Sequence, residues 1–280
     1  MSGPLTGIRI LDLTNVISGP FATMILADQG ANVIKVELPG IGDFVRSTGN
    51  KQGGMSATFL NNNRNKQSIT IDLKDRKGTD VLLKLAKSCD AVVQNFRPGV
   101  VERIGIAYDD VKKVKPDIVY LSISGFGEKG PYSQKPTYDP IVQALSGLTT
   151  VQAGSDEERP RLIRTIVPDK VTALTASQAM TAGLLSKYRT GEGQHIRLSM
   201  LDSVIAFMWS SDMGGQTYVG KQVSAQRAAS FIDLIYETKN GYMSVSTMTN
   251  AQWAGLSRAV EKPEWLDDDR FQSAELRDFN

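Results

Sequence analysis

Few side chains in this sequence could serve the common acid–base or nucleophilic catalytic arrangements. His195 is the only histidine and Cys89 the only cysteine, so Ser-His-Asp or Cys-His chemistry has a single possible base. His195 stands in an alternating strand pattern, where a polar strand residue is the simpler interpretation. Cys89 is interpreted as a small buried thiol, and a lone cysteine predicts a reducing compartment. Carboxylates acting alone therefore remain the candidates for nucleophilic chemistry.

Metal and nucleotide chemistry find little support in the residue types and their spacing. A metal site would depend on carboxylates, and Asp267–Asp269 is interpreted as a solvated charge run rather than a ligand set. The expected first strand, Ile8–Thr14, is followed only by Gly19 and Gly30, whereas the dinucleotide fingerprint needs glycines spaced G-x-G-x-x-G. The sequence also lacks a phosphate-binding P-loop. We therefore predict no metal site and no nicotinamide cofactor.

Asp169 is the most distinctive carboxylate, because it follows Pro168 at the start of the most helix-like segment, Asp169–Tyr188. One interpretation is structural: aspartate at a helix start caps the free backbone N–H groups. The other is catalytic. The helix dipole would keep this carboxylate ionised, and carboxylates form covalent intermediates. The residues alone leave both interpretations open.

Short β-branched runs alternate with helical patterns in the first 200 residues. The expected strands are Ile8–Thr14, Asn32–Glu37, Ser68–Leu73, Ala91–Phe96, Ile118–Ser124 and Gln194–Met200. The expected helices are Gly19–Gly30, Asp75–Ser88, Asp169–Tyr188 and Leu201–Met213. This alternation predicts an α/β fold with a doubly wound, mostly parallel, Rossmann-like sheet. The segment Ile41–Asn65 is too long for an ordinary connection, and we expect a functional loop there.

Three regions are expected along the chain. Residues 1–200 form the large Rossmann-like domain, 201–230 a linker helix and loop, and 231–280 the start of a smaller α+β domain. That small domain should open with a hairpin over Phe231–Met248, turning at Asn240-Gly241. A short helix over Ala251–Val260 and a polar end should follow.

The bulk properties are those of an ordinary globular protein. Net charge is +2 with acids and bases interspersed, which argues against a nucleic-acid partner. No apolar run approaches the ~20 residues needed to cross a bilayer, and the N-terminus lacks the features of a secretory signal. A cytoplasmic protein without membrane contact is the expectation.

Several sequence blocks, in order along nearly the whole chain, together resemble the family III CoA-transferases, which are related to the α-methylacyl-CoA racemases. The blocks are the opening GIRILDLTNVISGPFATMILADQGANVIKVE, Gly42-Asp43 with Arg46, Asn62–Leu73, Asn95–Gly99, Arg103–Gly105, Tyr138-Asp139, Gln143–Gly147, Asp169 and Thr190–Asp202. Any one of these blocks alone would be a weak signal for the family, whereas the whole set in this order is a specific one.

The resemblance implies that Asp169 is the catalytic carboxylate of a CoA-transferase. It would pass through a mixed anhydride and an aspartyl-CoA thioester, with an acyl-CoA and a carboxylic acid as substrates and no permanently bound cofactor. The implied coenzyme A site comprises Val16, Lys74, Asn95, Phe96, Arg103, Tyr138 and Asp139. Lys74 and Arg103 would suit phosphates. The resemblance also implies a homodimer of two interlocked chains, and leaves the donor and acceptor acids open.

Two alternatives remain beside this interpretation. The racemase branch has a histidine where Tyr138 stands, and racemisation needs two positioned bases, so Tyr138 disfavours it. The second alternative is an inactive, truncated family member, because relatives are longer and the small domain is expected to be incomplete at Asn280. Residues 224–230 read SAQRAAS, where some transferases have a glycine run that closes over the site. A closing glycine loop is therefore not expected.

Overall fold

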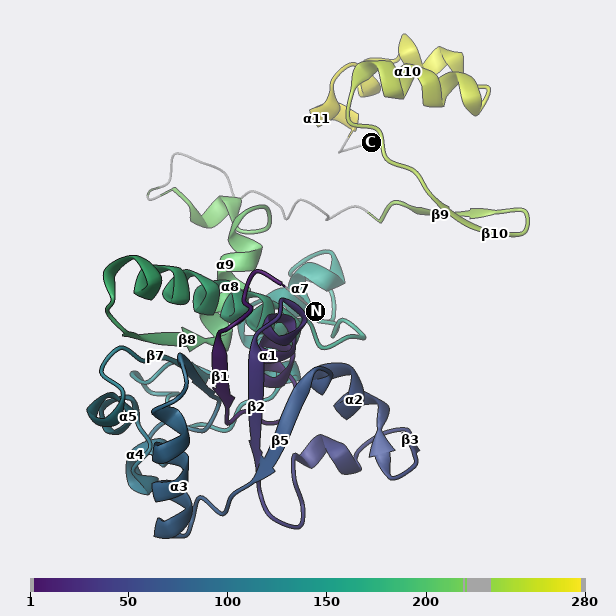
Figure 1. The fold of residues 1–280 in the computed structure, drawn as a ribbon. Helices are drawn as coiled ribbons and strands as arrows, with labels where there is room; N and C mark the ends of the chain where they lie inside the picture. Colours follow the sequence, from purple (N-terminus) through teal and green to yellow (C-terminus); the bar gives the residue numbers. More distant parts are fainter. Residues whose placement is uncertain (1–2, 219, 221–232, 278–280) are drawn as a thin grey trace.

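The fold is built around one six-stranded sheet in which every neighbouring pair of strands is parallel (Figure 1). The computed structural model describes residues 3–218, 220 and 233–277. In sheet order the strands are β5 (Lys66–Thr70), β2 (Asn32–Glu37), β1 (Arg9–Asp12), β6 (Ala91–Gln94), β7 (Val119–Ser124) and β8 (Gln194–Ser199). The predicted α/β fold with a mostly parallel sheet is confirmed.

Helices cover both faces of the sheet, and neighbouring residues of β1 show why. Ile10 is buried in the core that contains helices α1 (Ser18–Asp28) and α8 (Val167–Thr190). Leu11, the next residue, points to the opposite face, as alternate strand residues must. There it joins a core with α3 (Arg76–Ala86), α4 (Val100–Ile104) and α5 (Tyr108–Val114). Both faces of the sheet are therefore apolar.

The remaining elements of the large region lie between or after the strands. They are η1 (Phe44–Ser47), β3 (Lys51–Gln52), β4 (Met55–Ser56), α2 (Ala57–Asn63), α6 (Asp139–Leu145), α7 (Leu148–Ala153), α9 (Met200–Trp209) and η2 (Gly214–Gln216). The segment Ile41–Asn65, for which a functional loop was expected, contains regular elements. This segment folds into η1, the β3–β4 pair and α2, anchored by buried Val45 and Phe59.

The C-terminal region contains the predicted hairpin and helix. Strands β9 (Ile235–Thr238) and β10 (Gly241–Ser244) pair antiparallel, and α10 (Asn250–Ala259) follows. Gly241 pairs with Thr238, so the loop is Lys239-Asn240 and the predicted turn is wrong by one residue. The polar end also folds, into η3 (Pro263–Leu266), η4 (Asp269–Phe271) and α11 (Ala274–Arg277). Phe231, Ile232 and the stretch 224–230 lie outside the described residues.

The aromatic side chains missed in that polar end explain its structure. Trp253 of α10 stacks on Trp265 at 5.8 Å between ring centroids, and Phe271 lies 5.3 Å from Trp253. Three aromatic side chains bury enough apolar area to order the short helices around them. Within the described ranges, no helix combines the length and apolar content needed to cross a bilayer.

Candidate active site

A cavity of about 280 Å³ opens beyond the carboxyl ends of β1, β6 and β7. The chain leaves β1 toward β2 on one side, while β6 lies on the other. Ligands bind open α/β sheets at such a topological switch point. Six predicted site residues line this cavity: Val16, Asn95, Phe96, Tyr138, Asp139 and Asp169. Lys74 and Arg103 are exposed and do not line it.

Asp169 lies in the first turn of α8 but does not cap the helix. The helix begins at Val167, and its N-cap is Ile166. The capping interpretation is therefore wrong. Instead, the Oδ2 atom of Asp139 accepts the backbone N–H of Asp169 at 3.2 Å. A neighbouring helix supplies this cap, which leaves the carboxylate of Asp169 available to the cavity.

Asp139 is held in place by Gln143, one turn further along α6. The Nε2 atom of Gln143 donates to Oδ1 of Asp139 at 2.7 Å and to the Thr165 carbonyl at 3.2 Å. Its Oε1 atom accepts the Ile163 N–H at 2.9 Å. Gln143 thus ties α6 to the segment before α8, and the buried Asp139 carboxylate is fixed beside Asp169.

The environment of Asp169 makes its carboxylate an unusually strong base. Burial, together with the nearby Asp139 carboxylate, raises the pKa of Asp169 to about 6, although the hydroxyl and backbone N–H of Ser18 act in the opposite direction. Burial and a like charge both disfavour the ionised form. Asp169 is therefore ionised above about pH 6, and its basicity exceeds that of a solvated aspartate. Perturbed carboxyls in clefts are characteristic of functional sites.

The loop between β1 and α1 forms one wall of the cavity. Asn95 fixes it from the end of β6: its Oδ1 atom accepts the Asn15 N–H at 2.9 Å, and its Nδ2 atom donates to the Asn15 carbonyl at 2.8 Å. Both ends of the Asn95 amide are therefore engaged with backbone. The next residue, Phe96, is fixed in turn, because its N–H donates to Oε1 of Gln94 at 2.7 Å.

Sequence reasoning missed several residues that the structure brings to the cavity. Ser18, Arg97 and Lys135 all line it. Ser18 stands in the opening block and Arg97 in the Asn95–Gly99 block, so the matching blocks could have indicated both. Lys135 lies in a loop with no distinctive pattern. Its position depends on the long connection between β7 and α6, which the sequence does not specify.

The lone histidine and cysteine have structural positions, as the sequence suggested. His195 in β8 lies 2.8 Å from the Ser122 hydroxyl through Nε2 and stacks on Tyr108. It does not line the cavity. Cys89 is a buried free thiol, and burial raises its pKa. No group of three or more potential metal ligands occurs in the part of the chain that the structure describes.

Comparisons with known proteins agree with the fold. The family model described as CoA-transferase family III matches residues 5–280. The human succinyl-CoA:glutarate CoA-transferase is 38% identical over 99% of this chain, and the acetyl-CoA:oxalate CoA-transferase of Acetobacter aceti is 40% identical over 74% of it. The matches cover 64% and 53% of those proteins, so the chain spans less than two thirds of their length.

A solved structure gives the same result. The crystal structure of Rv3272 from Mycobacterium tuberculosis superposes with a TM-score of 0.84 at 29% sequence identity. The superposition covers 100% of this chain and 75% of that one. Because the family model spans nearly every residue and the fold matches over the full chain, the protein belongs to the CoA-transferase family III.

Proposed function

We propose that this protein is a CoA-transferase that moves coenzyme A from an acyl-CoA to a free carboxylic acid, with Asp169 as the nucleophile. The observation that carries the proposal is the half-buried Asp169 carboxylate, with a pKa raised to about 6, on the wall of the cavity at the switch point. A carboxylate that is ionised at neutral pH and partly desolvated is suited to attack a carbonyl.

The chemistry balances without an external energy source. An oxygen of Asp169 attacks the thioester carbonyl and the C–S bond breaks. Coenzyme A leaves as thiolate, and the acyl group remains on Asp169 as a mixed anhydride. The thiolate then attacks the aspartyl carbonyl, which releases the donor acid and leaves an aspartyl-CoA thioester. The acceptor carboxylate attacks that thioester and again expels thiolate. Attack of the thiolate on the acceptor carbonyl gives the new acyl-CoA and restores the Asp169 carboxylate.

The acids to test first are suggested by the relatives' names, which contain glutarate, oxalate and succinyl groups. All three are dicarboxylic acids or derive from them. Succinyl-CoA and acetyl-CoA would be incubated with glutarate, oxalate or a monocarboxylate, and each new thioester identified by mass spectrometry. Transfer to at least one acid is expected. Hydrolysis without transfer to any acid would contradict the proposal.

The coenzyme A site is proposed to extend from the cavity across the surface to Lys74 and Arg103. Both side chains are exposed, as phosphate-binding cations on an open groove would be. Lys74→Ala or Arg103→Ala is expected to weaken coenzyme A binding by ~1–3 kcal/mol, the range for charge-assisted hydrogen bonds. Isothermal titration calorimetry with free coenzyme A would measure the change.

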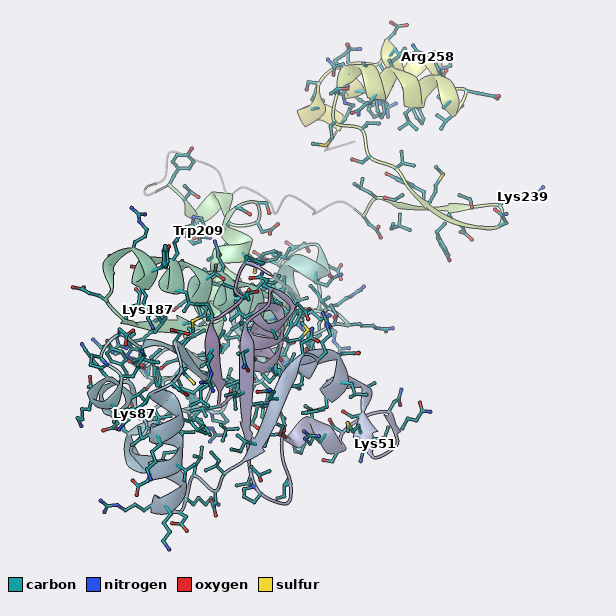
Figure 2. The ribbon with its side chains drawn as sticks, in the orientation of Figure 1. Lys51, Lys87, Lys187, Trp209, Lys239 and Arg258 are labelled. Carbon is teal, nitrogen blue, oxygen red and sulfur yellow. The ribbon has the colours of Figure 1, made fainter. Side chains whose placement is uncertain are left out.

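Lys87 provides the matched control for this binding test. It is an exposed lysine at the end of α3 (Figure 2) and does not line the cavity. Lys87→Ala should leave the affinity for coenzyme A unchanged. Equal affinity in all three variants and the wild type would remove Lys74 and Arg103 from the proposed site.

Racemisation is disfavoured by the position of the histidine. Tyr138 lines the cavity where the racemase branch would have a histidine, and His195 bonds to Ser122 outside it. In heavy water, a 2-methylacyl-CoA is therefore expected to keep its α-hydrogen, as followed by mass spectrometry. Rapid deuterium uptake without a carboxylic acid present would favour the racemase interpretation instead.

We also propose that the chain works as a homodimer in the cytoplasm. Large apolar side chains are exposed on α8, including Leu185 and Tyr188. Trp209 is exposed at the end of α9 (Figure 2). Exposed aromatic and aliphatic side chains of this size are common at interfaces. The buried free thiol of Cys89 suits a reducing compartment. Size-exclusion chromatography with light scattering would test the dimer, and a monomer at micromolar concentration would contradict it.

A further inference from the structure

The turn that leads from β1 into α1 holds a valine in an unfavourable backbone conformation. Val16 has φ of 72°, in the left-handed region where a β-branched residue is a genuine outlier. Such a conformation is costly for valine and persists only where the surroundings determine it. Val16 lines the cavity, and Ser18, two residues later, interacts with Asp169. The strained turn therefore lies two residues before the side chain that interacts with the proposed nucleophile.

A buried ion pair holds this turn from the far side of the cavity wall. The Oδ1 atom of Asp43 accepts the Val16 N–H at 3.2 Å and the Val45 N–H at 3.1 Å. The Oδ2 atom of Asp43 lies 2.9 Å from Nζ of Lys35. Lys35 in turn donates to the Thr14 carbonyl at 2.7 Å. The side chains of Lys35 and Asp43 are 1% and 0% exposed. The buried pair therefore binds the turn at the Thr14 carbonyl and the Val16 N–H.

Asp43 is itself fixed by a second buried acid. Its backbone N–H donates to Oε2 of Glu37 at 2.9 Å. Both carboxylate oxygens of Glu37 accept from the Arg46 guanidinium, at 2.6 and 2.7 Å. Gly42, at φ of 68°, has no room for a side chain because a Cβ atom would lie 2.8 Å from Glu37 and Arg46. The glycine, aspartate and arginine of this block thus form one rigid support.

We propose that Asp43 is a positioning residue for the transfer reaction: by holding the left-handed turn at Val16, it sets Ser18 against the Asp169 carboxylate. This inference rests on the proposed function, because it assigns Asp43 a role only through Asp169. Asp43 is not among the residues that line the cavity. Its carboxylate acts through the backbone of Val16 and the start of α1.

The test uses the ionisation of Asp169 itself, followed by carbon-13 NMR of its carboxyl group. In Asp43→Asn the turn relaxes, Ser18 withdraws, and the midpoint of the Asp169 titration is expected to rise by about one pH unit. Loss of a negative charge alone would lower the pKa of a neighbouring carboxyl, so the direction separates repositioning from a direct charge effect. The maximal rate of Asp169 acylation at saturating acyl-CoA should fall about tenfold, with KM nearly unchanged.

Two substitutions of Val16 test the same route with the Lys35–Asp43 pair intact. Proline at position 16 removes the tethered N–H and excludes the left-handed backbone, so Val16→Pro should reproduce the rise in the Asp169 midpoint. Glycine keeps the N–H and adopts positive φ freely, so Val16→Gly should leave the midpoint where it is. The proline variant keeps the test decisive even if Asp43→Asn does not fold.

Asp28 offers a matched control at the opposite end of α1, where it pairs with Arg64. Asp28→Asn should not move the Asp169 midpoint. An unchanged midpoint in folded Asp43→Asn or Val16→Pro would overturn the proposal, as would the same rise in Val16→Gly. If Asp169 is never acylated in the wild type, the proposed function fails. The titration would still report whether Asp43 positions the start of α1.

Discussion

Replacing Asp169 by asparagine is expected to leave a folded protein whose CoA-transfer rate has fallen by several orders of magnitude. The fold should tolerate the change, since the backbone N–H of Asp169 keeps its bond to Asp139 and the helix has its N-cap at Ile166. The chemistry should not, because an amide has no charged oxygen to attack a thioester. Circular dichroism would monitor the fold, and a mass-spectrometric transfer assay the rate.

Asp202 supplies the control for this substitution. It occupies the third residue of α9, the same helix position that Asp169 occupies in α8, and it is exposed. Asp202→Asn should therefore transfer coenzyme A at nearly the wild-type rate. In the wild type, acyl-CoA with hydroxylamine should convert the Asp169 side chain to a hydroxamate. Substantial activity in Asp169→Asn, or hydroxamate on another carboxyl, would show that the nucleophile lies elsewhere.

The same residue should determine the acid limit of activity. Asp169 must be ionised to attack, and burial together with the Asp139 carboxylate raises its pKa to about 6. The rate should therefore be full above this pKa and fall tenfold per pH unit well below it. A solvated aspartate would keep the rate constant down to about pH 4.

The alternation of apolar strands and helices was enough to predict the sheet. β2 occurs at the predicted bounds, Asn32–Glu37, because its β-branched residues are buried on both faces, as in a parallel strand. β5 begins two residues before the expected Ser68. Its first residue is Lys66, and lysine is depleted in β-strands. The side chain of Lys66 is buried because it pairs with Asp12 of β1, and the sequence around Lys66 does not indicate that pairing.

The sequence could indicate those site residues that stand in recognisable sequence blocks. Asp169 and Asp139 stand in recognisable blocks, and both reach the cavity. The position of Ser18 beside Asp169 was not predictable, because it depends on α1 and α8 packing side by side on one face of the sheet. The capping interpretation failed for the same reason. Asp139, thirty residues earlier, supplies the cap, and only tertiary structure brings the two together.

Lys66 and its partner Asp12 lead to the second large expected effect, which is on stability. Nζ of Lys66 lies 3.0 Å from Oδ2 of Asp12, with the side chains 2% and 0% exposed. Lys66 also donates to the Pro20 carbonyl and to Asn63. Burial alone would raise the pKa of Asp12, but Lys66 and Lys35, with hydrogen bonds from Thr14, hold it at about 2. Asp12 thus stays ionised at the centre of the sheet.

Asp12→Ala should lower the free energy of unfolding by about 3–5 kcal/mol, the usual cost of leaving a buried charge without its partner. Urea denaturation followed by circular dichroism would measure it. Asp28→Ala, which breaks the exposed pair with Arg64, should cost about 0–1 kcal/mol. Because the pKa of folded Asp12 lies below its ordinary 3.8, the contribution of the ion pair is lost as pH falls from about 4 toward 2; it is also lost as pH rises through about 8, to which burial lowers the pKa of Lys66.

A double substitution separates the ion pair from the loss of packing. In Asp12→Ala with Lys66→Met, the uncompensated ammonium is gone and an apolar chain of similar length takes its place, so most of the lost stability should return. The two single costs would then exceed the double cost by more than about 1 kcal/mol, as expected for residues in contact. If instead the two single costs added up to the double cost, Asp12 would stabilise the sheet through its bonds to Thr14 and Thr23. Burial lowers the pKa of Lys66 to about 8, so its amine is still mostly protonated at neutral pH and non-additive costs are the expected result.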